Sequence, residues 1–147
     1  MDILNQFKLT ENIASSGQPS AAQFEGIASS GYQVVINLAM PDHENSIANE
    51  GSIVTSLGMT YMHIPVPFDA PTNDHLETFS GYMDALERQK VWVHCIVNAR
   101  VSAFLFCYLQ KNRGLSAKQS ATPILEQWLS QMDDVWKGFI SKAPEQL

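Results

Sequence analysis

The chain alternates between short runs of β-branched residues and longer segments with helical spacing. Apolar runs typical of buried strands occupy residues 13–16, 32–38, 60–66 and 91–94. Helical spacing with capping residues occupies residues 20–30, a segment ending at Gly58, residues 72–86 and residues 100–112. This alternation predicts an α/β fold in three layers. We expect a mainly parallel sheet of four or five strands with helices on both faces.

The last third of the chain lacks strand patterns and predicts helices around residues 116–131 and 133–141. Gly114 separates this region from the preceding helix. The chain has 147 residues without repeats, low-complexity segments or a linker. That length fits one domain covering residues 1–147, large enough to bury its own core.

Charge and composition narrow the function classes. The formal net charge is −6, which argues against a nucleic-acid surface or an anionic membrane surface as partner. No apolar stretch approaches the roughly 20 residues of a membrane helix, and no signal peptide precedes the first strand, so we expect a cytoplasmic protein. The four histidines show no metal-ligand spacing, and we expect neither metal nor cofactor.

Cys95 and Arg100 mark the strongest candidate site. Residues 91–94 end as a buried strand, Cys95 follows directly, and a helix begins near Arg100. The N–H groups of a loop before a helix form a cradle for anions, and the same positive potential favours a thiolate. An arginine at the helix start can grip two phosphate oxygens. The alternative is a structural cysteine beside a surface arginine. The phosphate-binding candidates are Ile96, Val97, Asn98, Ala99 and Arg100.

The residues around this loop resemble a known family. Val93-His94-Cys95, followed by Arg100 and Ser102, resembles the signature loop of protein tyrosine and dual-specificity phosphatases. Segments 16–20, 34–38 and 61–66 resemble a small bacterial phosphatase-like family that is also found attached to β-lactamase-like hydrolases. Together these segments span roughly residues 13–112, in the family's order.

The resemblance implies a phosphomonoester hydrolase that works through a cysteinyl-phosphate, with Cys95 as nucleophile. Its substrate would be a phosphorylated protein or a small phosphate ester. The family's loop has five residues between cysteine and arginine, one of them glycine, whereas this chain has four and no glycine. Asn98 is the residue best able to take the positive φ of that glycine. A shorter ring with fewer N–H donors predicts weak activity.

Two other functions remain open at this stage. The four-residue spacing also resembles the active loop of rhodanese sulfurtransferases, in which a smaller ring holds a cysteine persulfide. A binding-only pseudophosphatase would hold an anion on the same loop without turnover. Turnover of an aryl phosphate, compared with Cys95→Ser, distinguishes these possibilities.

The resemblance places a general acid in the loop after the third strand. Asp69 is the best match, and its alternative role is that of a turn residue before a proline. Asp74 is the second candidate and Asp42 the third. Asp74 has a simpler role as an acidic residue at the start of a helix, and Asp42 has one as a turn residue.

Four further residues have supporting roles in this interpretation. His94 is expected to fix the loop through hydrogen bonds, since its side chain points to the opposite face of the strand from its neighbours. Ser102 resembles the family's hydroxyl that helps the thiolate leave, although one residue intervenes after Arg100; a serine of the first helical turn is the equal alternative. Gln18 and Asn37 are candidates for bracing neighbouring loops.

Cys107 is expected to serve packing only. It lies about seven residues into the predicted helix, roughly 10 Å from its start, because each helical residue rises 1.5 Å. A disulfide requires Cα atoms within ~7 Å, which excludes Cys95 as its partner. We therefore expect Cys107 in the core beside Ala103, Phe104 and Phe106.

Overall fold

The structure is a computed structural model that describes residues 2–147. Its strands are β1 (Phe7–Thr10), β2 (Ile13–Ser16), β3 (Val34–Asn37), β4 (Thr60–His63) and β5 (Val91–His94). Its helices are α1 (Ala21–Ser29), α2 (Glu50–Ser56), α3 (Asn73–Ala85), α4 (Ala99–Arg113), α5 (Ala117–Ser120), α6 (Pro123–Trp128), the 3-10 helix η1 (Leu129–Gln131) and α7 (Asp134–Ile140). In the described part of the chain, no helix is long and apolar enough to cross a membrane.

The five strands form one sheet in the order β1-β2-β5-β3-β4. Four of them are parallel, and β1 is an antiparallel edge strand paired with β2. In the central strand β5, Val91 pairs with Ile13 of β2 on one side and with Val34 of β3 on the other. The predicted α/β class and strand number are confirmed. The sequence pattern did not predict β1, whose short edge position leaves its residues exposed or half-buried.

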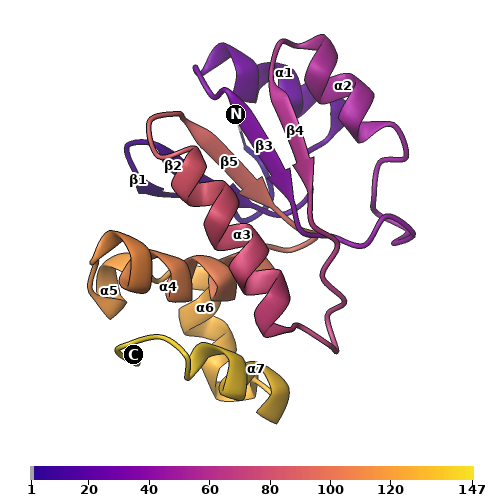
Figure 1. Cartoon of the computed structure of the whole chain (residues 1–147). Coiled ribbons are helices and arrows are strands. Elements are labelled where there is room, and N and C mark those ends of the chain that lie inside the picture. The colour runs from indigo at the N-terminus through magenta and orange to yellow at the C-terminus, as the bar shows by residue number, and fades with distance from the viewer. Residues whose placement is uncertain (1) are drawn as a thin grey trace.

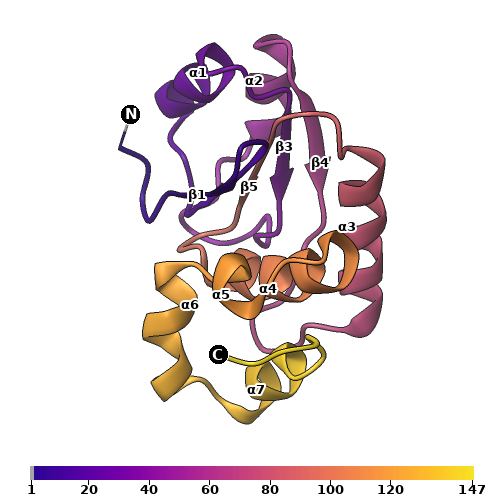
Figure 2. The same cartoon turned by 90° about the vertical axis from the view of Figure 1, so that its left-hand side faces the viewer.

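Helices cover both faces of the sheet (Figures 1 and 2). Side chains alternate between the faces along each strand, so each face has its own core. On one face α1 and α2 pack Phe24, Ile27 and Val54 against the sheet. On the other, α3 and α4 contribute the larger core, in which Phe79 and Phe104 meet edge to face.

Helix α4 is buried along most of its length, from Ala99 to Gln110. It packs against α3, and α5, α6 and α7 cover its outer side. Figure 2 shows α4, α5, α6 and α7 gathered at the end of the molecule below the sheet. The C-terminal end of the chain thereby completes a core that the sheet alone leaves open.

Most predicted boundaries match the structure, with two corrections. Ser20 and Thr72 cap α1 and α3 with reciprocal side-chain hydrogen bonds, as predicted. The strand predicted for residues 60–66 ends at His63, because prolines follow that cannot donate to a sheet. The single helix predicted for residues 116–131 is interrupted at Thr122, which caps a new helix beginning with Pro123.

Candidate functional site

Cys95 lies at the carboxyl end of the central strand β5, where the chain turns into α4. The parallel strands β2, β3 and β4 end at the same edge, so the segments after them surround the Cys95 loop. Ligands of parallel sheets bind at this edge. The position is the one expected from the sequence.

The carbonyl groups of the loop are held by donors outside the loop. His94 Nδ1 lies 3.0 Å from the oxygen of Cys95, and the Gln18 N–H donates to that of Ile96 at 2.9 Å. Asn5 Nδ2 donates to the oxygen of Val97 at 3.0 Å. Every one of these carbonyls is therefore tied to the surrounding structure.

The N–H groups of the same loop are unused. No residue that the structure describes accepts a hydrogen bond from the N–H of Ile96, Val97 or Asn98. The first turn of α4 adds further N–H groups that have no partner within a helix. Carbonyls fixed on one side and free N–H groups beside a helix start are the properties of an anion site.

Asn98 supplies the sharp turn between the loop and α4. Its φ is +74°, in the left-handed region, as the sequence predicted for the residue in the glycine position. Asn98 Nδ2 donates to the carbonyl of Asn5 at 2.9 Å and to Ser15 Oγ at 3.0 Å. Asparagine tolerates this conformation better than most residues, and these contacts hold it there.

Arg100 carries a charge without a carboxylate partner among residues 2–147. Its side chain is only 6% exposed, and Nη1 donates to the carbonyl of Val66 at 2.8 Å. The ring of Phe68 lies 5.8 Å from its guanidinium carbon. A buried guanidinium that is neutralised by no carboxylate leaves positive potential available to an anion.

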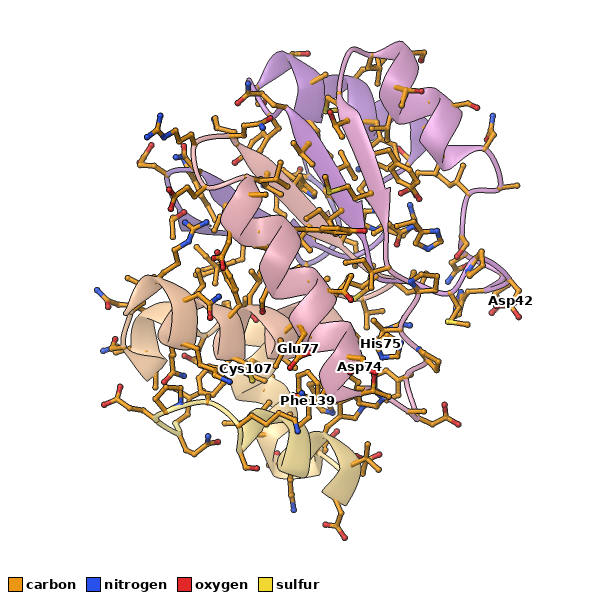
Figure 3. The ribbon with its side chains drawn as sticks, viewed as in Figure 1. Asp42, Asp74, His75, Glu77, Cys107 and Phe139 are labelled. Atoms are coloured by element: carbon orange, nitrogen blue, oxygen red, sulfur yellow. The ribbon has the colours of Figure 1, made fainter. Side chains whose placement is uncertain are left out.

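The best acid candidate, Asp69, follows Phe68 in an exposed turn closed by a hydrogen bond from Ala70 to Pro67. This turn lies beside Arg100 through the contact with Phe68. Asp74 lies in the first turn of α3, and Asp42 projects from the outer side of the loop after β3 (Figure 3). The ranking of these three carboxylates, with Asp69 first, stays a prediction.

The family comparison agrees with the chemistry of this loop. The family described as "Polymorphic toxin system, DSP-PTPase phosphatase" (Tc-R-P) matches residues 12–113, more than half of the chain. The chain belongs to this family. The match contains Cys95, Arg100 and Asp69. No curated protein sequence matches the chain.

Solved structures support the same assignment for this phosphatase-family protein. A DUF442 candidate phosphatase from Shewanella putrefaciens CN-32 is 30% identical with a TM-score of 0.86, over 95% of this chain and 88% of that one. Two others share the fold at lower identity. Tk-PTP is 18% identical with a TM-score of 0.74, over 97% and 98% of the two chains. TpbA of P. aeruginosa, in complex with pTyr, is 15% identical with a TM-score of 0.68, over 95% and 82%.

His94 has the bracing contacts expected of it, and its second partner was missed. Its Nε2 lies 2.6 Å from Oε2 of Glu50, a residue of α2 that is only 2% exposed. The two ring nitrogens of His94 thus join the carbonyl of Cys95 to the carboxylate of Glu50. Nothing in the sequence singled out Glu50, which reads as an ordinary acidic residue at a helix start.

The carboxyl of Glu50 is ionised in this phosphatase-family protein. Burial alone would raise its pKa, but hydrogen bonds from His94, Gln18 and Tyr61 outweigh burial and hold the pKa below its ordinary value. Tyr61 also accepts a hydrogen bond from Asn37 at 3.0 Å. Gln18 and Asn37 therefore brace the loops after β2 and β3, as predicted.

Ser102 is buried, and its hydroxyl contacts Asn98 and Thr122. The family resemblance had implied a contact with the Cys95 thiolate instead. The Ser102 hydroxyl donates to Asn98 Oδ1 at 3.2 Å and lies 2.6 Å from the hydroxyl of Thr122. These contacts tie the start of α4 to the C-terminal helices. They provide no support for assistance to a leaving thiolate.

Cys107 belongs to the core, as predicted, and both cysteines are free thiols. Burial raises the pKa of the Cys107 thiol to about 12. Its Sγ lies 3.7 Å from the carbonyl of Phe139 on α7, and Figure 3 shows the two residues together below α3. This environment keeps Cys107 protonated and inert.

A cavity of about 340 Å³ adjoins the Cys95 loop. Ile96 and Val97 of the loop line it together with Leu4 and Ile47, and its remaining lining residues are uncharged. Val97 is 47% exposed, an unusual extent for an apolar residue beside a buried loop. The cavity suits an uncharged, largely apolar group.

Proposed function

We propose that this chain is a cysteine-dependent phosphatase that hydrolyses phosphomonoesters through a cysteinyl-phosphate. The arrangement of the Cys95 loop carries the proposal. Its carbonyls are tied outward, its N–H groups are free, and the unpaired charge of Arg100 lies at the start of α4. Family membership supports the same reaction class.

In the first step the Cys95 thiolate attacks phosphorus and the ester oxygen leaves with the bonding electron pair. The N–H groups of residues 96–100 and the Arg100 guanidinium stabilise the charge on the phosphoryl oxygens. Asp69 protonates the leaving oxygen. In the second step Asp69 takes a proton from water, which attacks the cysteinyl-phosphate and releases phosphate and the thiolate.

The substrate we propose is a phosphorylated protein or a small phosphate ester with an uncharged organic group. The cavity beside Val97 offers room for that group and no cation for a second phosphate. The structure of TpbA with pTyr is consistent with such a substrate for a protein of this fold.

The direct test is hydrolysis of an aryl phosphate by the purified chain. We expect slow release of phosphate that is lost in Cys95→Ser and in Arg100→Ala. Arg100→Lys should rescue little, since an ammonium group cannot reproduce the two-point grip of a guanidinium. Cys107→Ser and Arg88→Ala are the matched controls, because neither residue belongs to the site.

The role of Asp69 is tested by the leaving group. Asp69→Asn should slow the hydrolysis of esters with poor leaving groups most, because good leaving groups need less protonation. The matched control is Asp74→Asn, at the start of α3. Equal losses for both kinds of ester in Asp69→Asn would assign the acid role elsewhere.

One observation favours a binding-only protein as the second candidate. Cys95 has no exposed surface, so a substrate reaches the thiol only through the ring of N–H groups. A chain that binds inorganic phosphate at residues 96–100 without hydrolysing any ester would support this candidate. Formation of thiocyanate from thiosulfate and cyanide, with no ester hydrolysis, would instead support sulfur transfer.

A further inference from the structure

One buried carboxylate beside the site takes no part in the reaction steps proposed above. Glu50 opens α2 and is only 2% exposed. Each of its oxygens has its own partner: Oε2 lies 2.6 Å from His94 Nε2, and Oε1 accepts from Gln18 Nε2 at 2.7 Å. A buried carboxylate is tolerated only when its oxygens are satisfied in this way.

The two partners of Glu50 are also the residues that hold the beginning of the Cys95 loop. His94 bonds the carbonyl of Cys95 through Nδ1 at 3.0 Å, and the main-chain N–H of Gln18 bonds the carbonyl of Ile96 at 2.9 Å. Each oxygen of Glu50 is thus linked to one loop carbonyl through a single intervening residue, His94 or Gln18. Both carbonyls must stay turned away if the loop N–H groups are to face an anion.

We propose that Glu50 is a positioning residue that clamps the Cys95 loop through His94 and Gln18. The clamp joins three segments, the end of β5, the turn after β2 and the start of α2. The His94 ring joins the two sides of the clamp, with Nδ1 at the carbonyl of Cys95 and Nε2 at the carboxylate of Glu50. Only the catalytic consequence of the clamp rests on the proposed phosphatase function.

Glutamine keeps the shape of Glu50 but changes the hydrogen bonds of this clamp. An amide has one oxygen that accepts and one nitrogen that donates, whereas His94 and Gln18 both donate to position 50. In Glu50→Gln one of the two partners therefore faces a donor where it met an acceptor, so either that arm of the clamp weakens or the hydrogen bonding of the His94 ring changes. Aspartate retains the charge but is one methylene shorter and cannot keep both distances.

The experiment is nuclear magnetic resonance on the whole chain, comparing Glu50→Gln with the control Glu25→Gln, an exposed residue of α1. In Glu50→Gln we expect the Gln18 N–H to exchange with solvent about 10-fold faster, the proton signals of the His94 ring nitrogens to change, or both. The Leu38 N–H, which bonds the His94 carbonyl at 2.9 Å, should keep its protection. The affinity of residues 96–100 for inorganic phosphate should fall about 10-fold.

Unchanged exchange at Gln18 together with an unchanged His94 ring would overturn the proposal. Faster exchange at Leu38 to the same extent would also overturn it, because that pattern indicates general loosening. If the unmodified chain binds no phosphate, the proposed function fails, while the exchange and ring signals still decide the clamp. If Glu50→Gln does not fold, Gln18→Met removes one arm and should accelerate exchange of its own N–H.

Discussion

Replacing Asn98 separates the two ways in which this residue holds the Cys95 loop. Its side chain makes three hydrogen bonds, two from Nδ2 and one to Oδ1 from Ser102, and its backbone is left-handed at φ +74°. Asn98→Gly loses the hydrogen bonds and keeps the backbone conformation. Asn98→Ala loses both, so the difference between the two variants measures the backbone contribution alone.

The expected sizes follow from these contacts. Three hydrogen bonds at about 0.5–1.5 kcal/mol each predict a loss of roughly 1.5–4.5 kcal/mol in the free energy of unfolding for Asn98→Gly. Alanine adds about 1–2 kcal/mol for its left-handed backbone. The greater freedom of glycine in the unfolded chain offsets roughly 0.4–1 kcal/mol of this difference. Asn98→Ala should therefore be less stable than Asn98→Gly by about 1 kcal/mol.

Urea unfolding at pH 7, followed by tryptophan fluorescence, measures both values. Phosphate binding at residues 96–100 should survive better in Asn98→Gly, since glycine adopts the native turn without strain. An alanine variant as stable as the glycine variant, or more stable, would refute the claim that backbone geometry at this position matters. A glycine variant as stable as the unmodified chain would refute the hydrogen-bond contribution.

Three other perturbations test the site and the core. A Cβ at Gly17 would lie 2.5 Å from the carbonyl oxygen of Ile96, so Gly17→Ala should destabilise the fold by about 1–3 kcal/mol in urea unfolding and shift the loop amide signals. The lowered pKa of Glu50 adds stability that is complete above the ordinary pKa of 4.5 and is lost as the pH falls through the lower pKa of the folded chain. The free energy of unfolding, measured from pH 7 to pH 3, should therefore depend less on pH in Glu50→Gln. The raised pKa of Cys107 acts in the opposite sense: stability should fall above pH 9, where the unfolded thiol ionises, and a thiol reagent at pH 9 should leave Cys107 of the folded chain unmodified.

The sheet and its main helices were predictable because their signals are local. Residues 34–36 and 91–93 are β-branched or apolar runs, and Ser20, Thr72 and Gly114 act as caps within one turn of the helices they bound. The Cys95 loop was predictable for the same reason, since a strand, a cysteine and a helix start follow each other directly. The left-handed Asn98 followed from its place in that loop.

The supporting contacts were not predictable because they join segments far apart in the chain. Glu50 and His94 are separated by 44 residues, and Asn5 reaches Val97 across 92. A short acidic helix start and a short N-terminal segment carry no pattern that marks either role. Strand β1 was missed for a related reason: at the sheet edge its four residues need no buried face, so they leave no alternation.

The helices that pack on the outer side of α4 limit where this domain can be truncated. The family match ends at residue 113, at the last residue of α4. Beyond it, Trp136 packs on Phe104 and Phe139, and its indole N–H donates to the carbonyl of Phe68 at 2.7 Å, beside Arg100. A fragment cut at residue 113 would present a bare aromatic surface to solvent and lose the support of the loop that holds Asp69. A transplant of this phosphate loop into another protein, or a chimaera between relatives, therefore has to carry the segment through α7.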